Sequence, residues 1–170
     1  MFRSSRFRGW ALPIGGVLVS VALTAAQGAA SGDAPEKADK KVLTLAGARS
    51  VAAAAEAEAA KGGATPAIAI VDDGGHVLLV IRPESTFAAA AEVSVQKART
   101  AALFKKETIA FENAVNGGRY ALLGVDVMTP LMGGVPIVVD GQVVGAIGIS
   151  GAKSQQQDDA IAHAAATVIK

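Results

Sequence analysis

A predicted β-hairpin spans residues 133–151 (GGVPIVVDGQVVGAIGISG) and constrains the fold more than any other stretch of the chain. Two runs rich in β-branched residues, 135–139 and 143–149, flank Asp140-Gly141. An Asp-Gly pair between apolar strands is a strong hairpin signal, because glycine adopts a positive φ without steric cost. We therefore expect two adjacent antiparallel strands here.

Two glycines, Gly145 and Gly148, lie inside the second of these strands. Glycine weakens a strand interior, so it often marks a position where another backbone or a ligand comes close. Gly133 and Gly134 stand at the start of the first strand. We interpret the hairpin as one side of a slot for a small ligand.

The other side of this slot is predicted on a helix at residues 87–105. One face of that helix holds four residues at i, i+4, i+7 and i+11 spacing, namely Val93, Lys97, Thr100 and Phe104. A lysine and a threonine between two apolar residues are typical of a face that lines a ligand. The alternative is that Lys97 extends to water from a half-buried face.

A second hairpin is predicted where two apolar runs, residues 67–71 and 77–81, are joined by Asp-Asp-Gly-Gly. Both runs are apolar on both faces, which in an antiparallel sheet indicates cover on both sides, by helices or by another subunit. Apolar periodicity and capping residues predict helices at residues 44–61, 87–105, 108–115 and 154–169. The predicted fold is a single α/β (α+β) domain, with a mainly antiparallel sheet of two hairpins flanked by helices in an α/β/α sandwich.

The N-terminus has the pattern of a secretory signal peptide. Three arginines precede the apolar residues 10–22, a run that is too short for a membrane span. Small residues permit cleavage after Ala26 or after Ala30. We expect a signal peptide at 1–26, a flexible linker at 27–42 and a ligand-binding domain at 43–170, with Sec-type export to the periplasm or the medium.

Composition excludes several classes of function. Loss of the three leader arginines lowers the formal charge from +1 to −2, so the exported domain is not expected to bind nucleic acid or a membrane surface. The chain has no cysteine, which excludes thiolate nucleophiles, iron–sulfur clusters and cysteine-ligated haem. The sequence also lacks phosphate-loop, dinucleotide-binding and zinc-protease motifs.

Two polar turns offer only weak catalytic signals. Residues 148–152 approach the G-x-S-x-G pattern around Ser150, but the last position is alanine and the next histidine, His163, lies on the following helix. We prefer a turn whose glycines and serine allow a close approach, or whose amides bind a carboxylate. His76 follows two aspartates, which provide too few ligands for a metal ion, so a histidine that is hydrogen-bonded at a strand start is favoured.

Five segments occur in order along the chain: VDDGGHVLLVIRPE (71–84), KARTAA (97–102) followed by Phe104 and Thr108, GGVPI (133–137), GAIGISGA (145–152) and QDDAIAHAA (157–165). As a set they resemble the haem-binding, "haem-degrading" family known as GlcG/HbpS, from about Leu43 to the C-terminus. The resemblance implies a helix-flanked antiparallel sheet that assembles as a homo-oligomer. Some members bind haem and some are secreted. This chain departs from the family after Arg82, where Pro-Glu-Ser-Thr replaces a Met-Asp-Gly-Ala-like segment.

Haem needs an apolar slot, cations for its propionates and an axial ligand. Arg82 and Lys97 are the predicted propionate partners. The predicted ligand-binding residues are His76, Arg82, Lys97, Thr100, Phe104, Gly133, Gly134, Gly148 and Ser150. The candidate axial ligands, among which the sequence does not choose, are His76, His163, Tyr120, Met128 and Met132.

The leading hypothesis is therefore an exported haem-binding protein, and two alternatives stay open. The same slot suits a small carboxylate, held by Arg82, Lys97 and the amides of Ser150-Gly151, in a binding or sensing module. A structural homo-oligomer joined through alanine-rich helix faces is the third hypothesis. Haem degradation or redox sensing needs bound oxygen and an electron source, which the sequence does not locate, so binding or sequestration is favoured over turnover.

Overall fold

Four strands form one antiparallel sheet in the computed structural model, which describes residues 39–170. The strands are β1 (Ala67–Asp72), β2 (Val77–Ile81), β3 (Gly134–Val139) and β4 (Gln142–Ser150), in the spatial order β2-β1-β4-β3. Both predicted hairpins are confirmed. Asp140 and Gly141 have φ values of 47° and 75°, as a two-residue hairpin turn requires. The predicted signal peptide (1–26) and most of the predicted linker lie outside the described residues.

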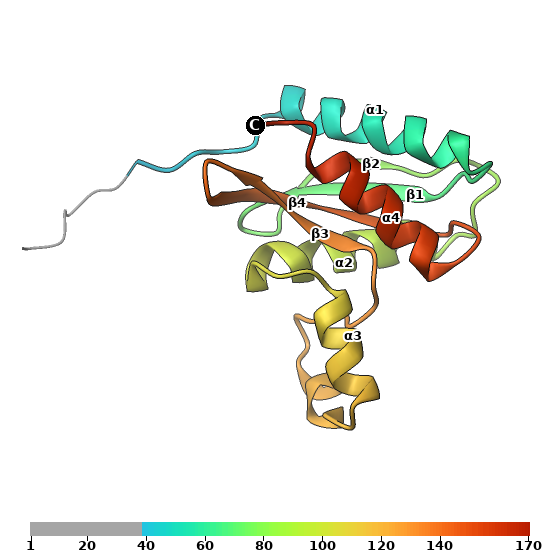
Figure 1. Ribbon diagram of the computed structural model, residues 1–170, viewed down its shortest axis with the longest axis vertical. Helices are drawn as coiled ribbons and strands as arrows, with labels where there is room; N and C mark the ends of the chain where they lie inside the picture. The colour runs from blue at the N-terminus through green and yellow to red at the C-terminus, as the bar shows by residue number, and fades with distance from the viewer. Residues whose placement is uncertain (1–38) are drawn as a thin grey trace, which may run out of the picture. The chain divides into compact units, whose positions relative to one another are not determined.

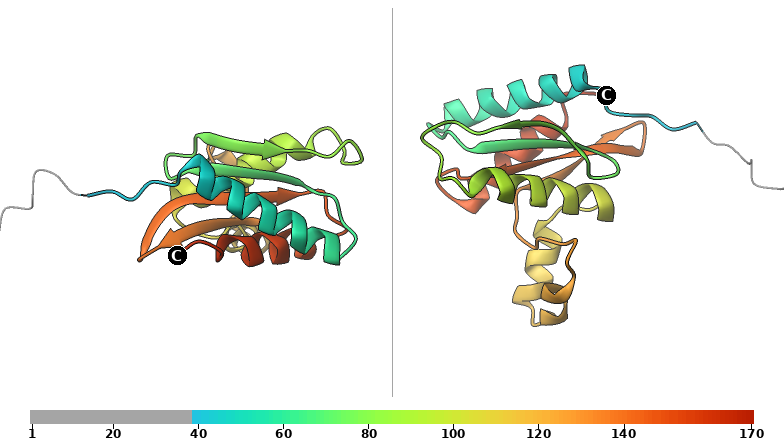
Figure 2. Two further views of the ribbon diagram at one scale, coloured as in Figure 1. Left: turned by 90° about the horizontal axis from the view of Figure 1, so that it is seen from above. Right: turned by 180° about the vertical axis from the view of Figure 1, so that it is seen from behind.

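Helices cover both faces of this sheet. The helices α1 (Leu45–Lys61) and α4 (Gln155–Ala166) pack on one face, and α2 (Ala90–Phe104) packs on the other (Figures 1 and 2). This arrangement confirms the predicted α/β/α sandwich. None of the helices within residues 39–170 has both the length and the apolar character needed to cross a membrane.

The two faces of the sheet are packed with side chains of different size. Isoleucines and valines fill the layer under α1 and α4, including Ile68 and Ile147. The layer under α2 consists of alanines and two valines, with Ala69 and Ala146 on the strands facing Ala98 on the helix. Because small residues meet on this side, the axis of α2 lies close to the sheet.

Side-chain capping explains where α1 and α4 begin. The Thr44 hydroxyl accepts a hydrogen bond from the Gly47 amide at 3.1 Å, and the Ser154 hydroxyl accepts one from the Gln157 amide at 3.2 Å, so both predicted N-caps are confirmed. The sequence Ser154-x-x-Gln157 also predicts a capping box, but its reciprocal half is wrong, because the Gln157 carboxamide accepts a hydrogen bond from the amide of Lys153 and not from that of Ser154. Thr108 precedes a helix but makes no capping hydrogen bond through its side chain.

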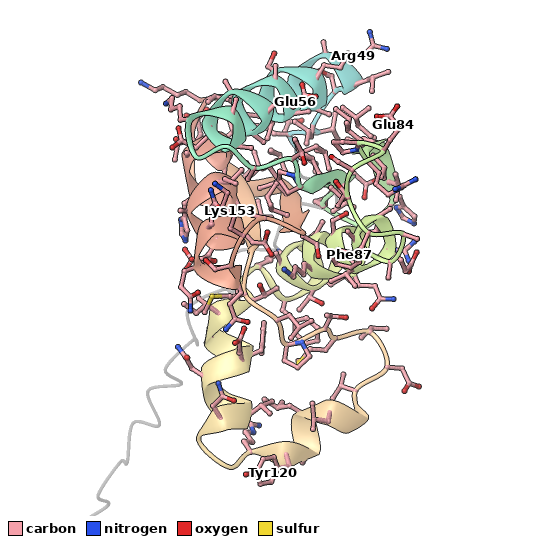
Figure 3. The ribbon with its side chains drawn as sticks, turned by 90° about the vertical axis from the view of Figure 1, so that its right-hand side faces the viewer. Arg49, Glu56, Glu84, Phe87, Tyr120 and Lys153 are labelled. Atoms are coloured by element: carbon pink, nitrogen blue, oxygen red, sulfur yellow. The ribbon has the colours of Figure 1, made fainter. Side chains whose placement is uncertain are left out.

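An arm of residues 109–132 projects from the sandwich (Figure 1). It contains the helix α3 (Ile109–Asn116) and the 3₁₀ helix η1 (Tyr120–Gly124), and neither of them has a buried residue. Figure 3 shows Tyr120 at the far end of the arm, where it is 67% exposed. Leu123, Val127 and Leu131 are also exposed. The arm therefore contributes almost nothing to the core of its own chain.

Candidate functional site

The predicted slot between β4 and α2 is closed by the helix backbone. A Cβ atom added at Gly148 would overlap the carbonyl oxygen of Ser94, and one added at Gly134 would lie 2.5 Å from the carbonyl oxygen of Lys97. The prediction of a slot at this position is therefore wrong. These glycines permit a close helix-to-sheet approach, which is the other meaning of glycine inside a strand.

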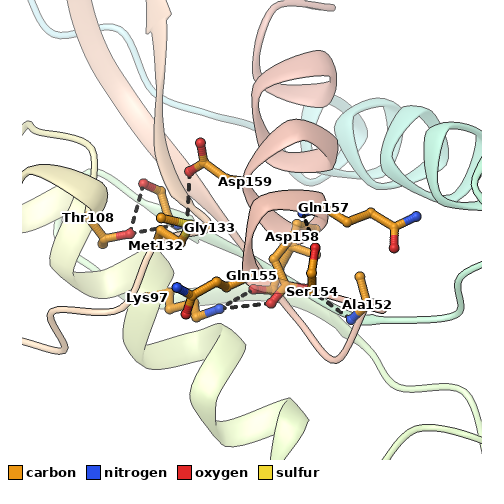
Figure 4. Close-up of polar contacts among 12 residues, drawn as sticks. Lys97, Thr108, Met132, Gly133, Ala152, Ser154, Gln155, Gln157, Asp158 and Asp159 are labelled. Atoms are coloured by element: carbon orange, nitrogen blue, oxygen red, sulfur yellow. Dashed lines mark hydrogen bonds and ion pairs between the residues drawn. The ribbon is translucent and has the colours of Figure 1, made fainter. Parts of the chain in front are cut away.

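Lys97 forms a buried ion pair inside the domain (Figure 4). The residue is only 3% exposed. Its Nζ donates hydrogen bonds to the Ile149 carbonyl at 2.8 Å and to the Asp158 carboxylate at 3.1 Å. The second oxygen of Asp158 accepts a hydrogen bond from the Ala152 amide at 2.9 Å. This cluster joins α2, β4 and α4. Because Lys97 is already paired, it is not free to bind a propionate on the surface.

A second polar cluster fixes the start of β3. The Thr108 hydroxyl accepts a hydrogen bond from the Gly134 amide at 2.9 Å, and the Asp159 carboxylate accepts one from the Gly133 amide at 3.1 Å (Figure 4). Gly133 has a φ of 106°, a conformation that glycine adopts without strain. The two glycines thus secure the point at which the arm returns to the sheet.

The remaining predicted ligand-binding residues are spread over the domain. The Thr100 hydroxyl donates to the Gln96 carbonyl, and Ser150 is buried beneath α2. Phe104 packs edge-on against Phe111, with ring centroids 5.2 Å apart. Arg82 is exposed, and its guanidinium donates to the Thr86 carbonyl at 2.8 Å. The structure does not bring these side chains together in one site.

A surface pocket of about 440 Å³ instead collects several polar and apolar side chains around His76. It lies between the β1–β2 turn, the outer face of α2 and the segment of the arm at residues 126–129. Its volume falls in the range of small-molecule sites. The residues that line it are Gly74, Gly75, His76, Glu92, Gln96, Arg99, Leu103, Asp126, Val127, Met128 and Thr129.

A carboxylate orients the imidazole of His76 in this pocket. Both oxygens of Asp72 lie 3.2 Å from Nδ1 of His76, and Oδ1 also accepts hydrogen bonds from the amides of Gly74 and His76. Partial burial opposes ionisation of Asp72, but the hydrogen bonds from His76 and Gly74 prevail and hold the pKa of this carboxyl below its ordinary value of 3.8. With Nδ1 bound to the carboxylate, Nε2 is the ring nitrogen left for another ligand.

Arg99 is a pocket residue that the sequence interpretation missed. Its Nε donates a hydrogen bond to the Gly75 carbonyl at 2.9 Å, so the turn holds the guanidinium beside His76. Glu92, Gln96, Arg99 and Leu103 follow one another at i, i+4, i+7 and i+11, the same spacing that drew attention to the face of Lys97. The sequence analysis selected the buried face of Lys97, whereas the exposed face with Arg99 is the one that meets the pocket.

The candidate axial ligands occupy different parts of the molecule. Met128 is half-buried and lines the same pocket as His76. His163 lines a separate pocket of about 450 Å³, where its Nε2 lies 3.6 Å from the carboxylates of Glu107 and Asp159. Tyr120 is at the tip of the arm, and Met132 is at its base, where its amide donates to Glu112. His76 and Met128 are therefore the candidates that share a pocket.

Free metal ions have no comparable site in the described part of the chain. Within residues 39–170, no three side chains of histidine, aspartate or glutamate converge as metal ligands do, and cysteine is absent from the sequence. A group that brings its own equatorial ligands, as a porphyrin does for iron, needs from the protein an axial donor and not a full ligand set.

Comparison with known proteins assigns the chain to a family. The family model described as "Haem degrading protein HbpS-like" matches residues 43–167. The chain belongs to this HbpS-like family. Its match to the protein GlcG of Escherichia coli K12 is 45% identical over 111 residues, which cover 65% of this chain and 83% of GlcG.

Solved structures of HbpS-like proteins share the fold. A double mutant of HbpS from Streptomyces reticuli superposes with a TM-score of 0.73 at 25% identity and covers 95% of this chain and 99% of its own. A complex described as PduOC with heme superposes with a TM-score of 0.69 at 25% identity and covers 76% and 96% of the two chains. The fold and the family inferred from the sequence segments are therefore confirmed.

Proposed function

We propose that this HbpS-like protein binds haem in the pocket around His76. The observation that carries the proposal is the pairing of Asp72 with Nδ1 of His76, a histidine that lines a pocket together with Met128, Arg99 and Leu103. A carboxylate that binds the other ring nitrogen is typical of histidines that ligate metals. The family and the heme complex of a structural relative support the same choice of ligand.

The donor set in this pocket fits haem. In a haem complex His76 would supply a nitrogen ligand for the iron, Met128 would supply a sulfur ligand, and Arg99 would supply a cation for a propionate. Leu103 and Val127 supply exposed apolar side chains for the macrocycle. Bound haem would bring a redox-active iron to the protein, while the residues of this chain bind and orient it. We favour binding or sequestration over degradation, which requires bound oxygen and an electron donor.

The test is a hemin titration of the purified protein, followed by the Soret band. We expect saturable binding, and the chain offers a matched pair of variants because it contains two histidines, His76 and His163. His76→Ala should weaken binding at least about tenfold, whereas His163→Ala should leave it unchanged. A larger loss of hemin affinity in His163→Ala than in His76→Ala contradicts the proposal, as does the absence of a Soret shift in the unaltered protein.

A small carboxylate is the second candidate ligand, and Arg99 is the observation that favours it. A guanidinium that is held by Gly75 and faces a pocket can form two parallel hydrogen bonds with a carboxylate. This role passes to Arg99 from Lys97, which is buried in its ion pair. A thermal shift with small organic acids, absent with hemin and abolished in Arg99→Ala, would select this function over haem binding.

We also propose that the protein is exported and forms a homo-oligomer. Export rests on the basic and apolar pattern of residues 1–26, and it predicts a periplasmic product that begins near residue 27 or residue 31. A cytoplasmic product of full mass contradicts it. The oligomer is supported by the exposed apolar residues of the arm, such as Tyr120 and Leu123, and it predicts a multiple of the chain mass in light scattering.

A further inference from the structure

Two hydrogen bonds of Thr129 attach the outer part of the arm to α2. The amide of Thr129 donates to the hydroxyl of Thr100 at 2.8 Å, and the Thr129 hydroxyl donates to the carboxamide oxygen of Gln96 at 3.0 Å. Within residues 39–170, no other hydrogen bond joins residues 117–131 to the sandwich. Because η1 has no buried residue, packing restrains this part of the arm only weakly.

The two hydrogen bonds differ in their exposure to water. Thr100 is fully buried, at 0% exposed, whereas Gln96 is exposed. The Thr100 hydroxyl donates its own hydrogen to the Gln96 carbonyl at 2.9 Å, so its lone pairs remain to accept the amide of Thr129. Water competes for the bond to the Gln96 side chain but not for the bond to Thr100. The Thr100 hydroxyl is therefore the stronger of the two attachments.

The attached segment forms one wall of the pocket around His76. Thr129 and its neighbours Val127 and Met128 all line that pocket, and so does Gln96 on the side of α2. The opposite wall is the β1–β2 turn, which contains His76. The position of Met128 relative to His76 therefore depends on how the arm is attached at Thr129.

We propose that Thr100 is a positioning residue of the His76 pocket. Its buried hydroxyl holds Thr129 against α2, and Thr129 in turn keeps Met128 in the pocket wall. Thr100 does not itself line the pocket, so it acts on a ligand through the arm and not by contact, unlike the role predicted for it from the sequence. The effect on binding rests on the proposed function, whereas the attachment of the arm by Thr100 stands without a ligand.

Amide hydrogen exchange, followed by NMR without ligand, tests the attachment. Thr100→Val keeps the shape of the side chain but removes the acceptor of the Thr129 amide. We expect that amide to exchange at least about tenfold faster in this variant. Thr100→Ser retains a hydroxyl and should retain slow exchange. An exchange rate of the Thr129 amide that is the same in Thr100→Val and in the unaltered protein overturns the inference.

Thr108→Val is the matched control for an effect on stability alone. Thr108 is also 0% exposed, its hydroxyl accepts a hydrogen bond from the Gly134 amide at 2.9 Å, and it does not line the pocket. Both valine variants lose the same kind of buried bond, so both should lower the urea midpoint. Only Thr100→Val should weaken hemin binding, by roughly fivefold to tenfold. Equal losses of hemin affinity in the two variants contradict a positioning role.

A double-mutant cycle tests whether Thr100 acts through Met128. Met128→Ala should weaken hemin binding roughly tenfold and shift the Soret band, and Thr100→Val should shift the band in the same direction. Residues that act through one another have effects that do not add. Thr100→Val should therefore cost less than about a further twofold in the Met128→Ala background. If the two losses of affinity simply multiply, the role of Thr100 through Met128 is wrong.

Thr129→Gly repeats the test from the side of the arm, without a change in the core. It removes the hydroxyl bonded to Gln96 and gives the backbone more freedom, so it should also weaken hemin binding in the presence of Met128. An unchanged affinity in Thr129→Gly contradicts the role of the attachment. If the unaltered protein binds no hemin, the proposed function fails, while exchange of the Thr129 amide still decides whether Thr100 holds the arm.

Discussion

Asp72 and His76 form a carboxylate–imidazole pair at the β1–β2 turn, with both carboxylate oxygens 3.2 Å from Nδ1. The pair fixes which ring nitrogen points away from the turn. Asp72→Asn preserves the size of the side chain but removes its charge, so the imidazole loses the carboxylate that orients it. We expect hemin affinity to fall by roughly 10-fold to 100-fold in a Soret titration. An unchanged hemin affinity in this variant would mean that Asp72 does not contribute to the ligand site.

The same pair predicts a dependence of stability on pH. The pKa of Asp72 is lowered in the folded protein because the hydrogen bonds from His76 and Gly74 outweigh the effect of burial. The ionised carboxylate therefore stabilises the fold above pH 3.8, and this contribution is lost as the pH falls through the lowered pKa.

Comparison of thermal unfolding between the unaltered protein and Asp72→Asn measures this contribution. The difference in Tm should be constant near neutral pH and should disappear below pH 3.8. An NMR titration of the Asp72 carboxyl should give a pKa below that value. A difference in Tm that grows on acidification has the wrong sign for this account.

The buried ion pair of Lys97 and Asp158 is expected to be essential for stability. Lys97→Ala leaves a buried carboxylate without its cation, which costs about 3–5 kcal/mol in the free energy of unfolding. Lys61→Ala, which removes an exposed ion pair with Glu58, should cost less than about 1 kcal/mol. Urea titrations of the two variants measure both values, and similar midpoints would mean that Lys97 has no such role.

The closeness of α2 to β4 makes Gly148 intolerant of a side chain. Gly148→Ala places a methyl group against the carbonyl oxygen of Ser94, so the helix must move, at a cost of about 1–3 kcal/mol or more. Gly124→Ala is the matched control, because a Cβ at that position of the arm meets nothing within 4 Å. Chemical denaturation of both variants tests the prediction, and a Gly148→Ala protein as stable as the control contradicts it.

The parts of the fold that local chemistry determines were predictable from the sequence. Asp140-Gly141 defines its hairpin because few residues adopt positive φ, and Thr44 and Ser154 mark helix starts because their hydroxyls satisfy free amides. The residues that make up the pocket were not predictable in the same way. They come from three segments that are distant in the sequence, and only the packing of α2 and the arm brings them together.

The glycines of β4 show why the slot was placed wrongly. A glycine inside a strand permits a close approach of either a ligand or another backbone, and sequence alone does not distinguish the two. Lys97 is similar, because a lysine on an apolar face is compatible with a ligand, with solvent or with a buried carboxylate. Asp158, the actual partner, is 61 residues away in the sequence, so no local pattern links the two residues.

Rescue of a cavity variant by free imidazole tests the central claim most directly. His76→Gly removes the proposed axial nitrogen and leaves room for a small heterocycle beside Asp72. Hemin added to this variant should show an altered Soret band, and free imidazole should restore the spectrum of the unaltered protein. A His76→Gly variant whose spectrum with hemin already equals that of the unaltered protein would contradict ligation by His76.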